Sequence, residues 1–217
     1  EILPLASLTK LMAATIILED INYDLKQSLT ISKTAASQEN VPNYGNLKVG
    51  ESLTVEKLLE LMLSYSSNDA VYALAEVIGI DNFVEKMNLR ARELGLNQSQ
   101  FLNPTGLEDS QNNFNYSTAD DLTILTKYIF RNHPLILEIT LKEKAYLIQN
   151  SISDLVLTEK QTMLGGKTGY TDEAGGCLIF LFRDENGNVF LNVILGSPSA
   201  EARIQEAQKL INWINSL

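Results

Sequence analysis

Apolar positions follow a helical period through the first two thirds of the chain and a strand-like pattern in the last third. The run from Ala6 to Leu18 has few polar positions, which predicts a helix that is buried on most sides. Ser/Thr caps and terminal glycines mark the ends of four further amphipathic segments. These helices are expected at 54–63, 68–78, 81–94 and 117–131. The stretch 97–116, rich in Asn and Gln, predicts a loop.

The last third carries dense apolar runs that predict an antiparallel sheet. Residues 177–183 and 189–195 are separated by a polar segment with an Asn-Gly pair, which is typical of a hairpin turn. Residues 165–170 are expected to lead into this hairpin as a third strand. An amphipathic helix is predicted over 199–214. Its expected core contacts are Ala202, Leu210, Trp213 and Ile214. Helices, then an antiparallel sheet, then a helix indicate an α+β fold in which the first and last helices cover the sheet.

Composition narrows the classes of function. The chain has 217 residues, a net charge of −10 and a pI near 4.6. A protein that tracks the nucleic-acid backbone needs a basic surface, so that class is excluded. One His and one Cys argue against a His- or Cys-rich metal site. A serine nucleophile would therefore need His133, or a base other than histidine.

The ends of the chain carry little information about compartment. No apolar run is long enough for a transmembrane helix, and no signal-peptide pattern is visible. Because the chain starts at Glu1 rather than Met, we expect a trimmed part of a longer protein.

The first candidate for chemistry is Ser7-Leu8-Thr9-Lys10, which has the spacing S-x-x-K. Residues at i and i+3 share a helix face, so the ammonium of Lys10 can reach the hydroxyl of Ser7. Apolar surroundings lower the pKa of a lysine toward that of a useful base. About one such match is expected by chance. The alternative interpretation is a lysine whose stem runs along the surface to solvent.

A second motif, Ser66-Ser67-Asn68, has the spacing S-x-N between two predicted helices. A further match, Ser110-Gln111-Asn112, lies in the polar loop. The first is preferred because a helix–helix junction holds side chains more firmly than a loop. Simple helix capping by Ser66 or Ser67 is the alternative.

The third motif, Lys167-Thr168-Gly169, follows Gly165-Gly166 and is the most specific of the three. Chance predicts about 0.04 such matches in a chain of this composition. A Lys and a Thr on a strand edge flanked by glycine let a ligand backbone approach and offer donors to a carboxylate.

The ordered set S-x-x-K, S-x-N and K-T-G resembles the signature of the penicillin-binding serine acyl-transferases. Local sequence is closest to their low-molecular-weight D-alanyl-D-alanine carboxypeptidases, over essentially the whole chain. The matching segments are Pro4–Met12, Ser66–Ala70, Leu74–Glu76, Glu93–Leu96, Phe101–Leu107 and Gly165–Gly175. The resemblance implies a β-lactamase/transpeptidase-like α+β fold, with an antiparallel sheet flanked by the N- and C-terminal helices and an all-helical lobe. It also implies a single penicillin-binding catalytic domain over 1–217, with a helical lobe at about 20–140 and a sheet lobe at 1–19 and 141–217.

The same resemblance implies the roles of the first two motifs in a D-Ala-D-Ala carboxypeptidase that needs no metal and no cofactor. Ser7 would be the nucleophile and Lys10 the base that takes its proton. Ser66 would pass a proton to the leaving amine, and Asn68 would hold Lys10 and the substrate amide. His133 would be a surface or capping residue.

The third motif would bind the substrate, a peptidoglycan stem peptide, with β-lactam antibiotics as covalent inhibitors. Lys167 and Thr168, with Gly169, would fix the terminal carboxylate, and the backbone N–H groups of Ser7 and Tyr170 would form the oxyanion hole. The family resemblance implies action outside the cytoplasm. Any membrane attachment would come through segments absent from this chain.

Three features depart from the family or compete with this interpretation. Strands that the family supplies upstream of the nucleophile are expected to be missing, and Tyr170 stands where the family often has His. Glu93 to Asn97 matches the E-x-x-L-N of class A β-lactamases, but Gly95 looks like a helix cap, so we interpret the match as accidental.

A β-lactamase or peptidoglycan endopeptidase of the same fold is one alternative function. An inactive, truncated peptidoglycan-binding domain is the other.

Overall fold

The computed structural model describes residues 1–38, 46–109, 111, 113–142 and 151–216. The predicted helices are confirmed within one or two residues at most ends. The longer helices are α1 (Thr9–Glu19), α2 (Val55–Ser64), α3 (Asn68–Glu76), α4 (Ile80–Leu94), α5 (Ala119–Asn132), α6 (Pro134–Thr140) and α7 (Ala200–Ile214). Short 3-10 turns occur at η1 (Ala6–Leu8), η2 (Ala35–Ser37) and η4 (Ile152–Asp154).

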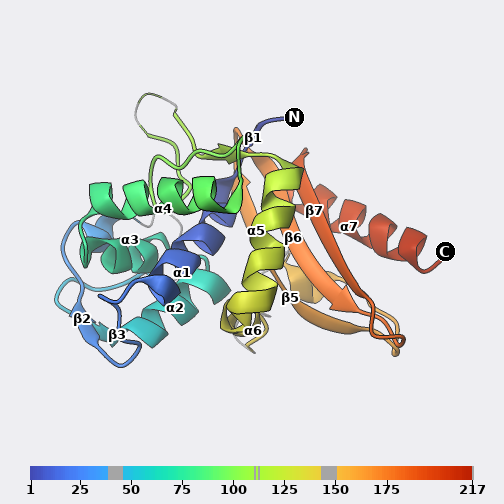
Figure 1. Cartoon of the computed structure of the whole chain (residues 1–217), viewed down its shortest axis with the longest axis horizontal. Helices are drawn as coiled ribbons and strands as arrows, with labels where there is room; N and C mark the ends of the chain where they lie inside the picture. Colours follow the sequence, from blue (N-terminus) through green and yellow to red (C-terminus); the bar gives the residue numbers. More distant parts are fainter. Residues whose placement is uncertain (39–45, 110, 112, 143–150, 217) are drawn as a thin grey trace.

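Helix α1 lies at the centre of the molecule. Every residue from Thr9 to Ile17 is buried, as its apolar sequence predicts. Figure 1 shows α2, α3 and α4 gathered on one side of α1 and the sheet on the other, with α5 crossing in front of the sheet. The helix that carries the S-x-x-K motif therefore lies between the group of helices and the sheet.

The main sheet is antiparallel, in the order β5-β6-β7 within the described residues. Its strands are β5 (Thr162–Thr171), β6 (Gly175–Arg183) and β7 (Val189–Ser197). Both faces of β6 are buried, because Cys177, Ile179 and Leu181 join the core around α1, while Leu178, Phe180 and Phe182 pack toward α7. Burial on both faces explains why β6 is apolar at nearly every position rather than at alternate ones.

Smaller pairings join distant segments. β1 (Leu3–Pro4) pairs with β4 (Tyr116–Ser117), and β2 (Ser28–Thr30) pairs with β3 (Ser52–Thr54). The first pairing places Tyr116 and Ser117 beside Leu3 and Pro4, a few residues before Ser7.

One prediction about α7 is wrong. Trp213 is 59% exposed, and the buried positions are Arg203, Ala207 and Ile211. The core-facing stripe runs at i, i+4 and i+8, and the small Ala207 lets the helix approach the sheet closely. Leu210 and Ile214 flank this stripe as expected. The division into a helical and a sheet lobe stays a prediction.

Candidate active site

Ser7 and Lys10 meet at the start of α1. Ser7 lies in the η1 turn, and the Lys10 ammonium donates a hydrogen bond to its Oγ at 2.9 Å. Ala6, just before the serine, has φ +44°, a conformation that costs a non-glycine residue about 1–3 kcal/mol. The turn is thus held in a shape that this sequence would not adopt alone, and the shape presents Ser7 to the amine.

The side chain of Lys10 is completely buried and reaches three acceptors. Besides Ser7 Oγ, its Nζ donates to Asn68 Oδ1 at 2.7 Å and to the carbonyl oxygen of Thr105 at 2.9 Å. The surface-lysine interpretation of the S-x-x-K motif is therefore wrong. A neutral amine has two N–H groups and one lone pair, so donation to Asn68 and Thr105 would turn the lone pair toward the Ser7 hydroxyl.

A second Ser–Lys pair lies beside the first. The Nζ of Lys167 donates to Ser66 Oγ at 3.0 Å and to the carbonyl oxygen of Thr168 at 2.8 Å. Ser66 has φ +62°, so it is strained like Ala6. Burial, the charge of Lys10 and the charge of Arg203 together hold the pKa of Lys167 well below its usual range. The two pairs therefore lie close enough for their charges to interact.

The strand that carries Lys167 is fixed by close packing at its glycines. The N–H of Gly166 donates to Thr140 Oγ1 at 3.1 Å, and a side-chain carbon at Gly165 would lie 2.8 Å from Leu137. At Gly169 such a carbon would lie 3.0 Å from the backbone nitrogen of Ser7. Glycine at these positions lets β5 approach both α6 and the nucleophile turn.

The structure brings together most of the predicted site. Ser7, Lys10 and Asn68 form one hydrogen-bonded group, and Ser66 and Lys167 form the other. Three predicted residues contribute on β5: Gly169 packs against the nucleophile turn, Thr168 gives its carbonyl to Lys167, and Tyr170 is about half exposed beyond them. The roles predicted for Thr168 and Tyr170 stay predictions. The competing match at 110–112 has Ser110 and Asn112 outside the described residues.

Two contacts of the site were not predicted from the sequence. The guanidinium of Arg203 donates to the carbonyl oxygen of Gly169 at 2.7 Å and ties α7 to the K-T-G strand. Asn103 accepts hydrogen bonds from the backbone N–H groups of Thr105 and Gly106, which shapes the turn that faces Lys10. An Asn-Pro-Thr-Gly sequence does signal a turn. Nothing in the sequence shows that this turn meets a lysine 95 positions away.

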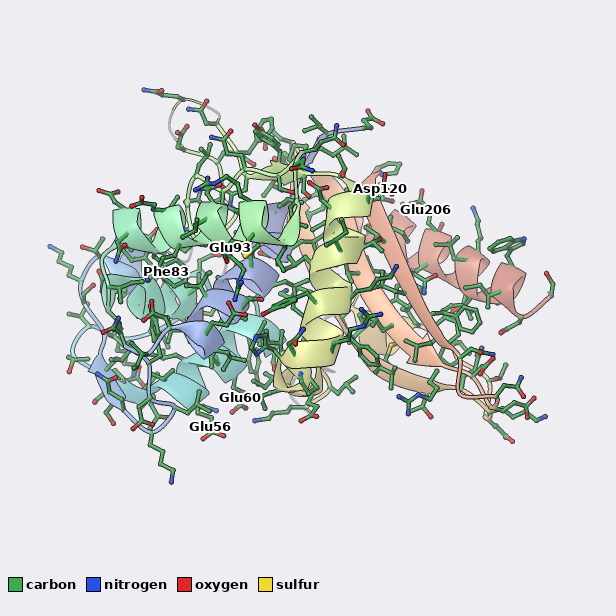
Figure 2. The ribbon with its side chains drawn as sticks, viewed as in Figure 1. Glu56, Glu60, Phe83, Glu93, Asp120 and Glu206 are labelled. Carbon is green, nitrogen blue, oxygen red and sulfur yellow. The ribbon has the colours of Figure 1, made fainter. Side chains whose placement is uncertain are left out.

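His133 and Glu93 lie away from Ser7. His133, between α5 and α6, bonds to Glu19 at the far end of α1 at 2.8 Å. Glu93, labelled on α4 in Figure 2, pairs with Arg90, which in turn bonds to Glu19. Helical rise separates the two ends of α1 by about 15 Å. Neither His133 nor Glu93 can then serve Ser7 as a base, and the E-x-x-L-N match is accidental, as expected.

The described part of the chain carries no signal of a metal-binding cluster or of a membrane-spanning helix. Across those residues no group of three or more His, Cys, Asp or Glu side chains is placed to hold a metal ion. No helix among them is long and apolar enough to cross a membrane.

The amino-acid sequence of this chain is similar to those of known proteins. A model of the family described as D-alanyl-D-alanine carboxypeptidase, peptidase S11, matches residues 1–199. The D-alanyl-D-alanine carboxypeptidase DacF of Bacillus subtilis is 31% identical over 221 residues, which cover 96% of this chain and 55% of that relative. The chain thus spans about half the length of this relative.

Solved structures share the fold. A peptidoglycan synthesis regulatory factor (PBP3) from Streptococcus pneumoniae superposes with a TM-score of 0.84 and 26% identity, covering 100% of this chain and 70% of that one. Penicillin-binding protein D2 from Listeria monocytogenes, in its ampicillin-bound form, gives a TM-score of 0.75 at 28% identity, covering 98% and 87% of the two chains. These likenesses confirm the expected β-lactamase/transpeptidase-like α+β fold. With the family model matching 199 residues, the chain belongs to the D-alanyl-D-alanine carboxypeptidase family, peptidase S11.

Proposed function

We propose that this protein is a serine-type D-Ala-D-Ala carboxypeptidase that removes the terminal D-Ala from peptidoglycan stem peptides. The observation that carries the proposal is the 2.9 Å contact between Lys10 Nζ and Ser7 Oγ, with Asn68 and Thr105 accepting from the same nitrogen. A buried amine with one hydroxyl and two fixed acceptors is suited to remove a proton from that hydroxyl.

Acylation of Ser7 is the first half of the proposed reaction. Neutral Lys10 takes the proton of Ser7 as Oγ attacks the carbonyl carbon of the penultimate D-Ala. The negative oxygen of the tetrahedral intermediate is stabilised by the backbone N–H groups of Ser7 and Tyr170. The C–N bond then breaks, and the proton that Lys10 took from Ser7 passes through Ser66 to the leaving amine of the terminal D-Ala, which leaves Lys10 neutral again. An ester on Ser7 and free D-Ala result.

Hydrolysis of this ester completes the cycle. Water loses a proton to Lys10 and attacks the ester carbonyl, and Ser7 regains its proton as the shortened peptide leaves. Through both halves Asn68 orients Lys10 and the substrate amide. Lys167 and Thr168, with Gly169 allowing close approach, hold the terminal carboxylate through charge-assisted hydrogen bonds. The partial burial of Ser7 and Ser66 leaves both hydroxyls at the edge of the site, where a peptide can reach them.

Binding partners and compartment follow from the same proposal. A penicillin has a reactive amide and a free carboxylate, so it would acylate Ser7 in place of the peptide; the ampicillin-bound relative from Listeria supports this. Peptidoglycan lies outside the cytoplasmic membrane, so we propose extracytoplasmic action.

A labelling experiment tests the proposal. Wild-type protein incubated with a fluorescent penicillin should carry a stable covalent label, and Ser7→Ala should carry none. The same protein should release D-Ala from an N-acylated peptide that ends in D-Ala-D-Ala. A folded wild-type protein that takes up no label would support the inactive-domain alternative. Turnover of the penicillin within seconds would support a β-lactamase, and cleavage of cross-linked peptide without D-Ala release would support an endopeptidase.

A further inference from the structure

Asn115 is a buried residue whose backbone and side chain contact the two sides of the nucleophile turn, although it is distant from Ser7 in sequence. Its exposed fraction is 0%. Its backbone carbonyl accepts from the N–H of Leu5 at 2.9 Å, and its Nδ2 donates to Thr9 Oγ1 at 3.0 Å. Leu5 and Thr9 bracket Ser7, so one residue holds the chain before and after the nucleophile.

The same amide holds the turn that faces Lys10. Asn115 Oδ1 accepts from the N–H groups of Leu102 and Asn103 at 2.7 and 3.2 Å. Its Nδ2 also donates to the carbonyl oxygen of Asn103 at 2.9 Å. All four hydrogen-bonding positions of the amide are then used, two as donor and two as acceptor. A side chain with only donors or only acceptors could not replace it.

Asn103 connects the residues that Asn115 contacts to the Thr105 carbonyl, which accepts from Lys10. Its Oδ1 accepts from the N–H groups of Thr105 and Gly106 at 3.1 and 2.8 Å, so the residues fixed by Asn115 fix the next two in turn. The carbonyl of Thr105, at the end of this chain of contacts, accepts from Lys10 Nζ at 2.9 Å. The position of that carbonyl relative to α1 is thus set by the bonds that join Asn115 to Thr9 and to Asn103.

We propose that Asn115 is a positioning residue for Lys10: it fixes the distance between α1 and the Thr105 carbonyl, and through that carbonyl the direction of the lysine lone pair. This inference rests on the proposed function, in which Lys10 is the base. Asn115 does not touch the substrate. Its loss should slow proton transfer from Ser7 and leave the binding of the terminal carboxylate, at Lys167 on another element, unchanged.

A matched pair of substitutions tests this role. Asn88 on α4 bonds to Phe101, the residue just before the two that Asn115 contacts. Its Oδ1 accepts from the N–H of Phe101 at 2.9 Å, and its Nδ2 donates to the Phe101 carbonyl at 2.7 Å. It does not contact α1 through these bonds. Asn115→Ser and Asn88→Ser therefore each remove an amide that bonds to the backbone of the 101–103 segment, and only the first breaks the connection to the nucleophile helix.

The measurement is kcat and KM for D-Ala release from an N-acylated D-Ala-D-Ala peptide, with active enzyme titrated by a fluorescent penicillin. For Asn115→Ser we expect kcat per active site to fall about 10- to 100-fold, because misplacing a catalytic group by about 1 Å has an effect of this size. KM should change less than about threefold, since carboxylate binding is separate from the altered contact. Asn88→Ser should keep kcat within about threefold of wild type.

Several outcomes would overturn the inference. Wild-type kcat in Asn115→Ser would do so, as would equal losses in both variants or a loss that appears in KM alone. If Asn115→Ser does not fold, Thr9→Val removes the acceptor on α1 with little change of shape, and it must lower kcat with KM retained. A wild-type protein that takes no penicillin label fails the proposed function itself, which separates that failure from failure of this inference.

Discussion

The two Ser–Lys pairs of the site have the same chemical groups and different origins. Ser7 and Lys10 are three positions apart on one helical turn, whereas Ser66 and Lys167 are 101 positions apart. Lys10 donates to a hydroxyl, an amide and a carbonyl, and its acceptors come from three different segments. Lys167 donates to Ser66 and to the carbonyl of its own neighbour, Thr168.

On the proposed function, we infer different tasks for the two pairs from this difference. An amine fixed by three acceptors from separate parts of the fold has little freedom, which suits transfer of one proton at a fixed distance. Lys167 has one acceptor on its own strand and one on a half-buried serine, and it can turn its charge toward an incoming carboxylate. The burial of two lysines so close together costs stability, and the charges of Lys10 and Arg203 add to that cost at Lys167.

The largest effect should come from breaking the first pair. Lys10→Ala should lower the rate of acylation by a penicillin about 10²- to 10⁴-fold, the usual contribution of a positioned general base. The rate is measured by stopped labelling with a fluorescent penicillin, alongside a thermal unfolding curve to show that the variant is folded. Lys57→Ala, a partly exposed lysine of α2 paired with Glu60, is the control and should acylate like wild type. Acylation of Lys10→Ala at near wild-type rate would falsify the base assignment.

The second prediction concerns the turn that supports the first pair. Gly106 has φ +88°, and a side-chain carbon there would lie 2.0 Å from the carbonyl oxygen of Ala6. Gly106→Ala should therefore lower the free energy of unfolding by about 3 kcal/mol, from backbone strain plus overlap. Gly95→Ala is the matched control, because Gly95 has φ +79° with nothing within 4 Å. It should lose about 1 kcal/mol from strain alone. Equal losses in urea unfolding would show that contact with the nucleophile turn is unimportant.

The third prediction tests whether Lys167, the lysine of the second pair, binds the terminal carboxylate of the substrate. A D-Ala-D-Ala peptide amidated at its C-terminus should react more slowly than the free acid by about 1.5–3 kcal/mol of transition-state free energy, the size of a hydrogen bond to a charged group. The comparison is kcat/KM for the two peptides, first with wild type and then with Lys167→Ala. The variant should show little preference between them. Equal rates with the wild-type enzyme would remove Lys167 and Thr168 from this role.

The sequence predicted the first pair better than the second for a physical reason. Helical spacing alone places Lys10 beside Ser7, and the apolar run around them predicts their burial. The contact between Ser66 and Lys167 depends on how β5 packs against the α2–α3 junction, and no local pattern contains that information. The motif order supplied it through family resemblance, whereas the positive φ of Ser66 had no sequence signal at all.

Elsewhere in the fold, too, local sequence signals predicted some features correctly and missed those that depend on tertiary packing. Caps and glycines predicted the ends of α2, α4 and α5, because these signals act within one turn. The buried face of α7 was predicted incorrectly at Trp213, because an amphipathic stripe can be rotated by one residue and still satisfy the pattern. Arg203, buried on that helix, was missed because charged residues are assigned to the surface by default.

The smallest predicted effect concerns the stability cost of the second pair. The pKa of Lys167 is held below its usual range by burial first, then by the charges of Lys10 and Arg203. The unfolded chain therefore binds a proton at this residue over a pH range in which the folded chain does not, and the stability of the wild type rises with pH across that range. A methionine has no proton to lose and fits a similar volume. Lys167→Met should therefore raise the free energy of unfolding at pH 7 by on the order of 1 kcal/mol, at the expense of activity.

The stability gained by Lys167→Met should shrink as the pH approaches 10.5, the ordinary pKa of a lysine. At that pH the wild-type Lys167 loses its proton in the unfolded chain as well as in the folded one. Urea unfolding of the two proteins at pH 7 and at pH 10 measures this, and the shared titrations of other residues cancel in the difference. Lys209→Met, an exposed lysine of α7, is the matched control and should leave stability within about 0.5 kcal/mol of wild type at both pH values. A Lys167→Met variant less stable than wild type at pH 7 would show that the hydrogen bonds to Ser66 and Thr168 outweigh the cost of the buried charge. The second pair would then stabilise the fold in addition to its proposed binding of the substrate.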